Sequence, residues 1–207
     1  MKKMILSEIK NSLIELKPFY KKWVIPNIYS WEELESLINL RPFVNDKRFV
    51  WKSTEKYTWN AGGWLTDLNS WPPDKLQKII DNNVCYLRDA SRANYKINKV
   101  CTELEQIFHA PADAHIYFNK NTGEMNYDGL GRHNDTQHNL ITLAQGKIEI
   151  KVWDNYNENI YKLEEGDVVF IPKGIDHQII SNDSRISVSF CIAGGPDFMQ
   201  ERDWITL

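Results

Sequence analysis

The stretch EGDVVFIPKGIDHQII, residues 165–180, contains the clearest strand and turn signals of this chain. A Gly-Asp turn at Gly166 opens it, and an apolar run with the character of a buried strand follows. The Pro172-x-Gly174 pattern then predicts a second turn, which reverses the chain. His177 comes directly after that turn and begins the next strand beside the first. A histidine there is either an ordinary core residue or one ligand of a metal site.

A second stretch, LGRHNDTQHNL at residues 130–140, supplies the partners that a metal site needs. His133 and Asp135 are separated by one residue, so in an extended chain both side chains point to the same face, about 7 Å apart along the chain. Two such ligands require a third donor, and His177 is the candidate. The alternative is that His133 and Asp135 are polar turn residues on the surface.

The second half of the chain predicts antiparallel strands with no helices between them. Alternating apolar and polar runs are separated by turn residues, which indicates a sandwich or barrel. We expect strands at residues 114–118, 139–145, 147–153, 168–172, 177–181 and 185–193, and hairpin turns at residues 119–124, 154–159 and 181–184.

The first half of the chain predicts mainly helices. Ser30 and Glu33 form a capping box, which predicts a helix over residues 32–40. Further helices are expected over residues 72–80 and 91–108. We therefore predict residues 1–110 as a helical extension that belongs to the same folding unit as a β core at residues 111–207.

Composition narrows the function classes. The 207 residues suit one domain, and the net charge of −3 gives no basic footprint for nucleic acid and no reason to expect a membrane surface. Three scattered cysteines indicate reduced thiols and no disulfide framework. Residues 1–22 carry charges within their apolar stretch and lack a small-residue cleavage site, so we expect no signal peptide or membrane span, and a cytoplasmic location.

Both ligand-bearing stretches resemble the two sequence motifs of the cupin superfamily. The spacing of Gly166, Pro172, Gly174 and His177 matches the second motif, and His133 to Gly146 resembles the first. The first motif departs from the pattern in three places. Its second histidine is replaced by Asp135, its glutamate by Asn139, and its leading glycine by Tyr127. The resemblance covers about a quarter of the chain and implies a double-stranded β-helix, or jelly roll.

The substitution of aspartate points to one branch of that superfamily. His-x-Asp with a distant histidine is the two-histidine, one-carboxylate triad that suits non-haem Fe(II) oxygenases. The chain is most similar to the Jumonji-type oxygenases, in which a helical region precedes the barrel. That resemblance implies Fe(II) on His133, Asp135 and His177, with 2-oxoglutarate and O₂ as cosubstrates. It implies hydroxylation or demethylation of a substrate, with no protein side chain as nucleophile or general base.

The distal carboxylate of 2-oxoglutarate needs a cation, and Arg185 is the residue that we predict for this. Arg-x-Ser after the last metal histidine resembles the cosubstrate anchor of many 2-oxoglutarate oxygenases, which adds Ser187. Jumonji-type relatives usually carry this anchor about two residues beyond Gly146, where this chain has Ile148. The alternatives are an outward-facing Arg185, with the anchor at Lys147 or Lys151.

Two further residues are predicted to contact the cosubstrate. Asn139 lies four residues beyond Asp135, and Tyr117 lies on the strand that enters the barrel; both are equally compatible with satisfied core polar groups. His115 and His138 occupy no motif position, so we expect each to have a structural role or to lie behind the metal ligands and support them.

Two other functions remain open from the sequence. One is a metal cupin without 2-oxoglutarate, such as a small-molecule dioxygenase or isomerase, in which Arg185 would face outward. The other is a non-catalytic cupin that binds a ligand. The substrate is either a protein or peptide side chain or a small metabolite, with specificity expected from loops at residues 40–75 and 119–130. A homodimer is compatible with the fold.

Overall fold

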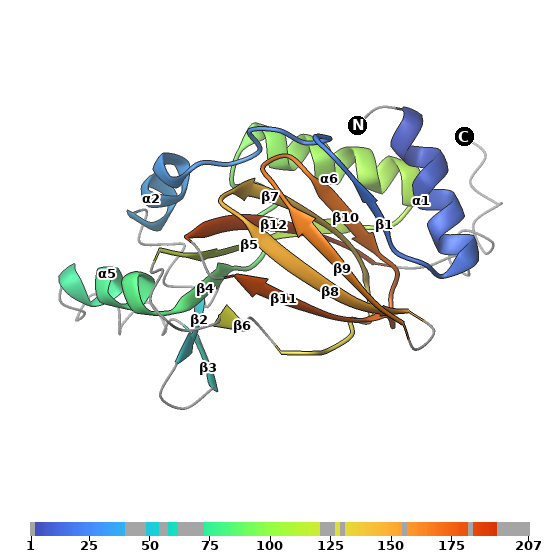
Figure 1. The fold of residues 1–207 in the computed structure, drawn as a ribbon. Coiled ribbons are helices and arrows are strands. Elements are labelled where there is room, and N and C mark those ends of the chain that lie inside the picture. Colours follow the sequence, from blue (N-terminus) through green and yellow to red (C-terminus); the bar gives the residue numbers. More distant parts are fainter. Residues whose placement is uncertain are drawn as a thin grey trace.

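Two antiparallel sheets form the body of the protein in the structure, which is a computed structural model (Figure 1). It describes residues 3–39, 49–53, 58–61, 73–120, 127–128, 131–154, 157–181 and 184–193. The expected turn at residues 119–124 and the two expected specificity loops lie largely outside this set. Among the described residues, no helix is long and apolar enough to cross a membrane.

The larger sheet has eight strands in the order β1-β10-β7-β12-β5-β4-β2-β3. Its central strand β12 pairs with β5 on one side and β7 on the other, and every residue of β7 except the last is buried. In chain order its strands are β1 (Phe19–Lys21), β2 (Phe49–Ser53), β3 (Thr58–Ala61), β4 (Val84–Leu87), β5 (Ala112–Asn119), β7 (His138–Gln145), β10 (Val168–Ile171) and β12 (Arg185–Ile192).

The smaller sheet has four strands in the order β6-β11-β8-β9. These are β6 (Tyr127–Asp128), β8 (Ile148–Asp154), β9 (Asn157–Leu163) and β11 (Asp176–Ser181). Side chains of β8 alternate between buried and partly exposed, as expected for a strand with one face on the core. The tight turn from β7 to β8 depends on Gly146, because a Cβ atom there would lie 2.2 Å from the carbonyl oxygen of Ser184.

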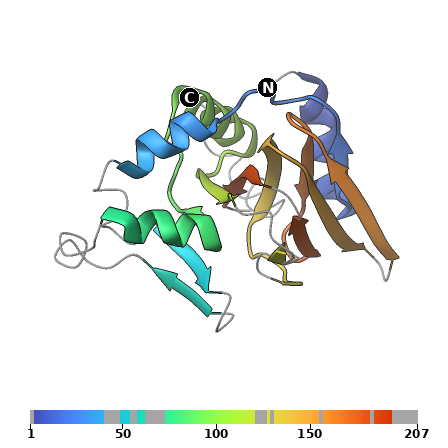
Figure 2. The ribbon, with the colours of Figure 1, turned by 60° about the vertical axis from the view of Figure 1, so that its left-hand side comes forward.

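Four helices are described: α1 (Lys3–Glu15), α2 (Trp31–Asn39), α5 (Pro73–Asn82) and α6 (Tyr95–Phe108). The predicted capping box is present, since Ser30 Oγ accepts from Glu33 N at 3.2 Å and Ser30 N donates to Glu33 Oε2 at 2.9 Å. Helix α6 contacts β5 and β12 and covers the outer face of the larger sheet. Figure 2 shows α2, α5 and the β2–β3 hairpin gathered at one end of the molecule.

Apolar residues form two clusters, and their positions leave room for a site. One cluster lies between the larger sheet and the helices and includes Leu104, Phe118 and Phe170. The other fills one part of the space between the two sheets and consists of Ile141, Leu143, Ile148, Ile150, Val152, Leu163, Val169 and Ile171. The space beside this second cluster is a polar pocket, described below.

The architecture confirms the predicted jelly roll with an N-terminal helical region, and it adds strands that the sequence did not reveal. Four strands of residues 1–110, β1 to β4, extend the larger sheet. Strand β9 begins at Asn157, inside the turn predicted for residues 154–159, so that prediction was too long. Strand β9 begins with the polar residues Asn157–Asn159, and only Leu163 of it is buried, so its start resembles a turn in the sequence.

Candidate metal centre

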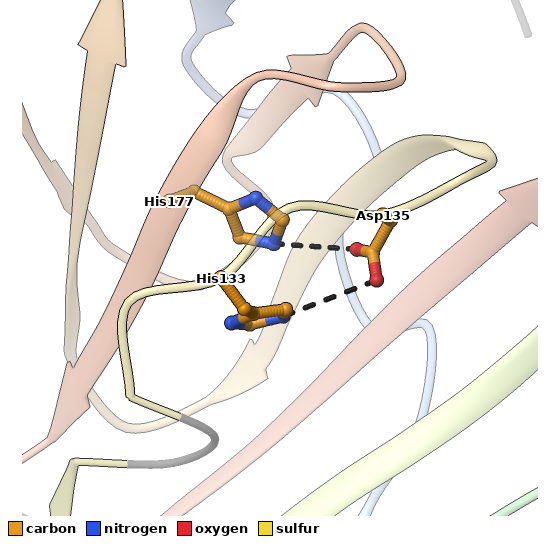
Figure 3. A group of neighbouring side chains, drawn as sticks. All are labelled: His133, Asp135 and His177. Atoms are coloured by element: carbon orange, nitrogen blue, oxygen red, sulfur yellow. Dashed lines mark ion pairs between the residues drawn. The ribbon is translucent and has the colours of Figure 1, made fainter.

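His133, Asp135 and His177 lie together, with one ligand-type atom from each within 4.8 Å of the others (Figure 3). Nε2 of His177 is 3.4 Å from Oδ2 of Asp135, and Nε2 of His133 is 4.0 Å from Oδ1 of the same carboxylate. Two ligands that are each about 2.1 Å from one metal ion lie roughly 3 to 4 Å apart. The spacing of the group therefore fits a shared metal ion.

The backbone fixes which nitrogen of each histidine faces the group. Nδ1 of His133 lies 2.9 Å from the carbonyl oxygen of Gly131, and Nδ1 of His177 lies 3.1 Å from that of Ile175. A carbonyl oxygen can only accept, so each Nδ1 carries the proton and donates it. Each Nε2 is then left with a free lone pair, which is the form that binds a metal.

Main-chain hydrogen bonds hold the two ligand segments together. His133 N donates to His177 O at 3.0 Å and His177 N donates to His133 O at 2.7 Å, which forms an isolated antiparallel bridge. Gly174 has a φ of +79°, a conformation that favours glycine, and its N–H donates to Asp135 O at 2.9 Å. The Pro-x-Gly turn of the sequence thus places His177 and also tethers Asp135.

The pKa of His177 is lowered, chiefly by burial. A lowered pKa keeps the imidazole neutral near pH 7. Its side chain is 3% exposed, against 25% for His133 and 39% for Asp135. The group therefore has one deep ligand and two at its rim.

A pocket of about 170 Å³ opens beside the group and contains several of the predicted residues. Its floor includes Ile141 and Ile179, which belong to or pack on the apolar cluster between the sheets. The remaining lining residues are Tyr86, His115, Tyr117, His133, Asp135, Gln137, Asn139, His177, Arg185, Ser189 and Cys191.

Arg185 lies in this pocket, which corrects the alternative that it faces outward on an edge strand. It is 1% exposed on the central strand β12, and its Nε donates to Asn119 Oδ1 at 3.1 Å. Its Nη1 is buried without a hydrogen-bond partner. Burial lowers the pKa of the guanidinium to about 10, so the side chain still carries its charge at neutral pH.

The other predicted cosubstrate contacts differ in their surroundings. Ser187 is buried and its Oγ has no partner, although it is not among the residues that line the pocket. Lys147 and Lys151 do not line the pocket either. Lys151 Nζ instead lies 3.7 Å from Glu158 Oε1, in an ion pair. Arg185 is the one Arg or Lys among the described lining residues.

Asn139 is engaged with a proposed ligand. Its Nδ2 donates to Asp135 Oδ2 at 2.5 Å, and its Oδ1 accepts from Ser189 Oγ at 3.4 Å. In this structure Asn139 therefore orients the Asp135 carboxylate. Tyr117 lines the pocket and stacks on Tyr86 with ring centroids 4.9 Å apart; burial raises its pKa, so its hydroxyl keeps its proton.

The two remaining histidines of the β core have different positions. His138 is buried against Phe108 and Phe170, and its Nδ1 accepts from Lys173 N at 3.0 Å, which is a structural role. His115 lines the pocket and also lies within a second group with Asp89 and Asp113.

Tyr86, Gln137 and Cys191 line the pocket as well, and no pattern in the sequence marks them as site residues. Tyr86 could have been found only through the pairing of β4 with β5, which places it opposite Tyr117.

Solved structures with a similar fold include the ribosomal oxygenase YcfD from Escherichia coli in complex with cobalt and 2-oxoglutarate. It is 16% identical, with a TM-score of 0.58 over 94% of this chain and 56% of YcfD. YcfD with cobalt and succinic acid is 17% identical, with a TM-score of 0.59 over 89% of this chain and 50% of YcfD. This chain thus spans about half the length of YcfD.

A third similar structure is the non-heme alpha-ketoglutarate-dependent epimerase SnoN from nogalamycin biosynthesis. It is 11% identical, with a TM-score of 0.53 over 92% of this chain and 84% of SnoN. No protein-family model matches the sequence, and no curated protein matches it. At these identities the likeness establishes the fold alone. The chain has a double-stranded β-helix fold similar to that of YcfD and SnoN.

Proposed function

We propose that this protein is an Fe(II)- and 2-oxoglutarate-dependent oxygenase. The proposal rests on one pocket that contains two features. The His-Asp-His group lies at its rim, and the buried Arg185, whose Nη1 lacks a hydrogen-bond partner, lies in its lining. Burying a cation without a carboxylate partner is costly. A ligand carboxylate at Arg185 would offset that cost.

The donor set favours iron of this class. Two neutral imidazoles and one carboxylate leave coordination positions open and leave positive charge on a divalent ion, which suits an anionic chelating ligand. His133, Asp135 and His177 would hold the metal, and Asn139 would keep the Asp135 carboxylate turned toward it. When bound, the metal would supply oxygen chemistry, with 2-oxoglutarate converted to succinate and CO₂.

The protein's own residues would bind, orient and shield the cosubstrate. The Arg185 guanidinium would pair with its distal carboxylate, and Tyr117 beside it would donate a hydrogen bond from its hydroxyl. Ser187 Oγ is buried on the same strand and would become a further donor by turning toward the pocket, which it does not line in this structure. The apolar floor at Ile141 and Ile179 would keep water away from the reacting end of the pocket.

The substrate belongs to one of two classes, a small metabolite or a protein or peptide side chain, and the reaction would be a hydroxylation or demethylation. The free thiols Cys85, Cys101 and Cys191 support a reducing, cytoplasmic location. A metal cupin without 2-oxoglutarate remains the rival, but it predicted an outward Arg185, and the buried position counts against it.

Anaerobic titration of 2-oxoglutarate into the Fe(II)-loaded protein tests the proposal. Chelation of iron by a 2-oxo acid should produce a weak visible metal-to-ligand charge-transfer band, which glutarate, lacking the 2-oxo group, should not produce. The band should be absent in His133→Ala. Tight iron binding without any band would overturn the use of 2-oxoglutarate and favour the rival.

A further inference from the structure

Three polar side chains beside the metal group form a connected set that we name the rim clamp: Arg132, Asn134 and Asp176. Each comes one position before a proposed ligand in the sequence. None of the three side chains lines the pocket, so the rim clamp lies outside it. They are partly exposed, at 52% for Arg132 and 33% for Asp176.

Asp176 is the centre of the rim clamp because its two oxygens bind two different partners. Oδ2 accepts from Arg132 Nε at 3.0 Å and lies 2.9 Å from Arg132 Nη2. Oδ1 accepts from Asn134 Nδ2 at 2.9 Å. These bonds to Asn134 and Arg132 hold the pKa of the Asp176 carboxyl below its usual range. One carboxylate thus bridges strand β11 to the segment that carries His133 and Asp135.

The strand next to β11 holds the other side of the clamp. The Arg132 guanidinium carbon lies 4.2 Å from the centroid of the Trp153 ring, a cation–π contact. Trp153 is the residue of β8 directly opposite Asp176 in the sheet. Arg132 is therefore held between a ring and a carboxylate that the sheet itself positions.

The segment that needs this support is irregular. Residues 131–137 form no strand apart from the bridge at His133, so regular sheet pairing does not fix Asp135 relative to His177. Metal ligands tolerate errors of only a few tenths of an ångström. A tether between the two segments therefore acts directly on the geometry of the group.

We propose that Asp176 is a positioning residue that sets the metal affinity of the site by locking the two ligand-bearing segments through the rim clamp. This inference rests on the proposed metal centre and adds a determinant outside its ligand set. The exposed ion pair contributes little to folding, because pairs in solvent are worth little. Its effect falls on metal binding, where removal of a residue that orients ligands typically weakens affinity by about 10- to 100-fold.

Co(II) titration, followed by the visible absorption of the bound ion, measures this effect in the whole chain without turnover. Asp176→Ala should bind Co(II) about tenfold more weakly than the wild type, with the melting temperature of the metal-free protein nearly unchanged. Arg132→Ala should weaken binding in the same direction. The double variant, with both Asp176→Ala and Arg132→Ala, should bind Co(II) no more weakly than Asp176→Ala alone, because both substitutions open the same clamp.

Glu149→Ala is the matched control, since it also removes one carboxylate from a surface ion pair of the smaller sheet, with Lys162 at 3.2 Å. It should bind Co(II) as the wild type does. Wild-type affinity in Asp176→Ala, or equal loss in both variants, would overturn the positioning role.

Hydrogen exchange of the metal-free protein separates this inference from the proposed function. The clamp predicts faster exchange at the His133 and His177 amides in Asp176→Ala, since these amides form the bridge between the segments. If the wild type does not bind Co(II), the proposed metal centre is wrong. The exchange rates would still show whether the rim clamp holds the two segments together. Unchanged exchange at both amides would overturn it.

Discussion

The two ends of the pocket are built in opposite ways. At the metal end, His133 and Asp135 stand on an irregular segment, partly exposed, and a few hydrogen bonds tie that segment to β11. At the other end, Arg185 is a fully buried residue of the central strand of the larger sheet. His133 and Asp135 can therefore change with little effect on folding, whereas any change at Arg185 acts on the core.

The electrostatics of the two ends differ in the same way. The metal end presents a carboxylate and two imidazoles to one point, which needs a cation. The Arg185 end presents a buried cation whose described polar partner is the neutral amide of Asn119. A ligand that chelates a cation at one end and carries a carboxylate at the other satisfies both. 2-Oxoglutarate has this combination of groups.

The largest effect is expected at the metal end. His133→Ala removes one of three ligands and should lower the affinity for Fe(II) or Co(II) by more than about 100-fold, with the fold intact because the residue lies at the rim. Metal content after anaerobic loading and dialysis measures this. His109→Asn is the control, since His109 is an exposed histidine with a φ of 50°, which asparagine tolerates. Equal metal content in the two variants would show that His133 is not a metal ligand.

The next effect separates ligand binding from stability at the other end. Arg185→Met should weaken 2-oxoglutarate binding by about 10- to 100-fold, the loss of a charge-assisted hydrogen bond of roughly 1.5–3 kcal/mol. Its unfolding free energy should stay level or rise, because an apolar chain replaces a buried charge. Calorimetry and denaturant unfolding measure the two quantities. Lys151→Met is the control and should leave both unchanged; if it weakens 2-oxoglutarate binding as much, the anchor is Lys151.

A smaller effect should connect the two ends. Asn139→Ala removes the hydrogen bond that orients Asp135 and should weaken metal binding by about tenfold, less than loss of a ligand. Asn139→Asp also removes the amide donor, but its negative charge would attract the cation, so it should lose less metal affinity than Asn139→Ala. Co(II) titration compares the variants. If Asn139→Ala retains wild-type metal affinity but loses 2-oxoglutarate affinity, Asn139 contacts the cosubstrate and does not position Asp135.

The smallest effect lies outside the pocket. Tyr20 Oη donates to Asp167 Oδ2 at 2.6 Å, and burial, with Asp167 next, raises the pKa of Tyr20 from 10.0 to about 12. The unfolded chain releases this proton near pH 10 and the folded chain does so later, so the stabilisation is complete below pH 10 and is lost as the pH rises toward 12. Tyr20→Phe should cost about 1 kcal/mol at pH 7.

That variant should also show a smaller fall in stability between pH 9 and pH 11 than the wild type, measured by denaturant unfolding at several pH values. Its metal and 2-oxoglutarate affinities should match those of the wild type. An equal alkaline fall in both proteins would show that another group titrates.

Local sequence was sufficient where a residue's position depends on its own strand or turn. The motif spacing brought His177 to His133 and Asp135, and the alternation around Arg185 gave its face. It was insufficient where position depends on pairing between distant segments. The sequence left open whether His115 is structural or supports the metal ligands, and the β4–β5 register places Tyr86 opposite Tyr117, in the pocket that His115 also lines. Likewise, Asn139 was expected on the side of the ligands as a cosubstrate contact, whereas in the structure its Nδ2 donates to Asp135 itself.

We propose that one ligand, 2-oxoglutarate, binds at both ends of the pocket. The decisive experiment is calorimetric titration of 2-oxoglutarate under anaerobic conditions, with and without Fe(II), into the wild type and Arg185→Met. We expect tight binding only in the Fe(II)-loaded wild type, with a large loss when either the metal or Arg185 is removed. Affinity that is independent of both the metal and Arg185 would overturn the proposal.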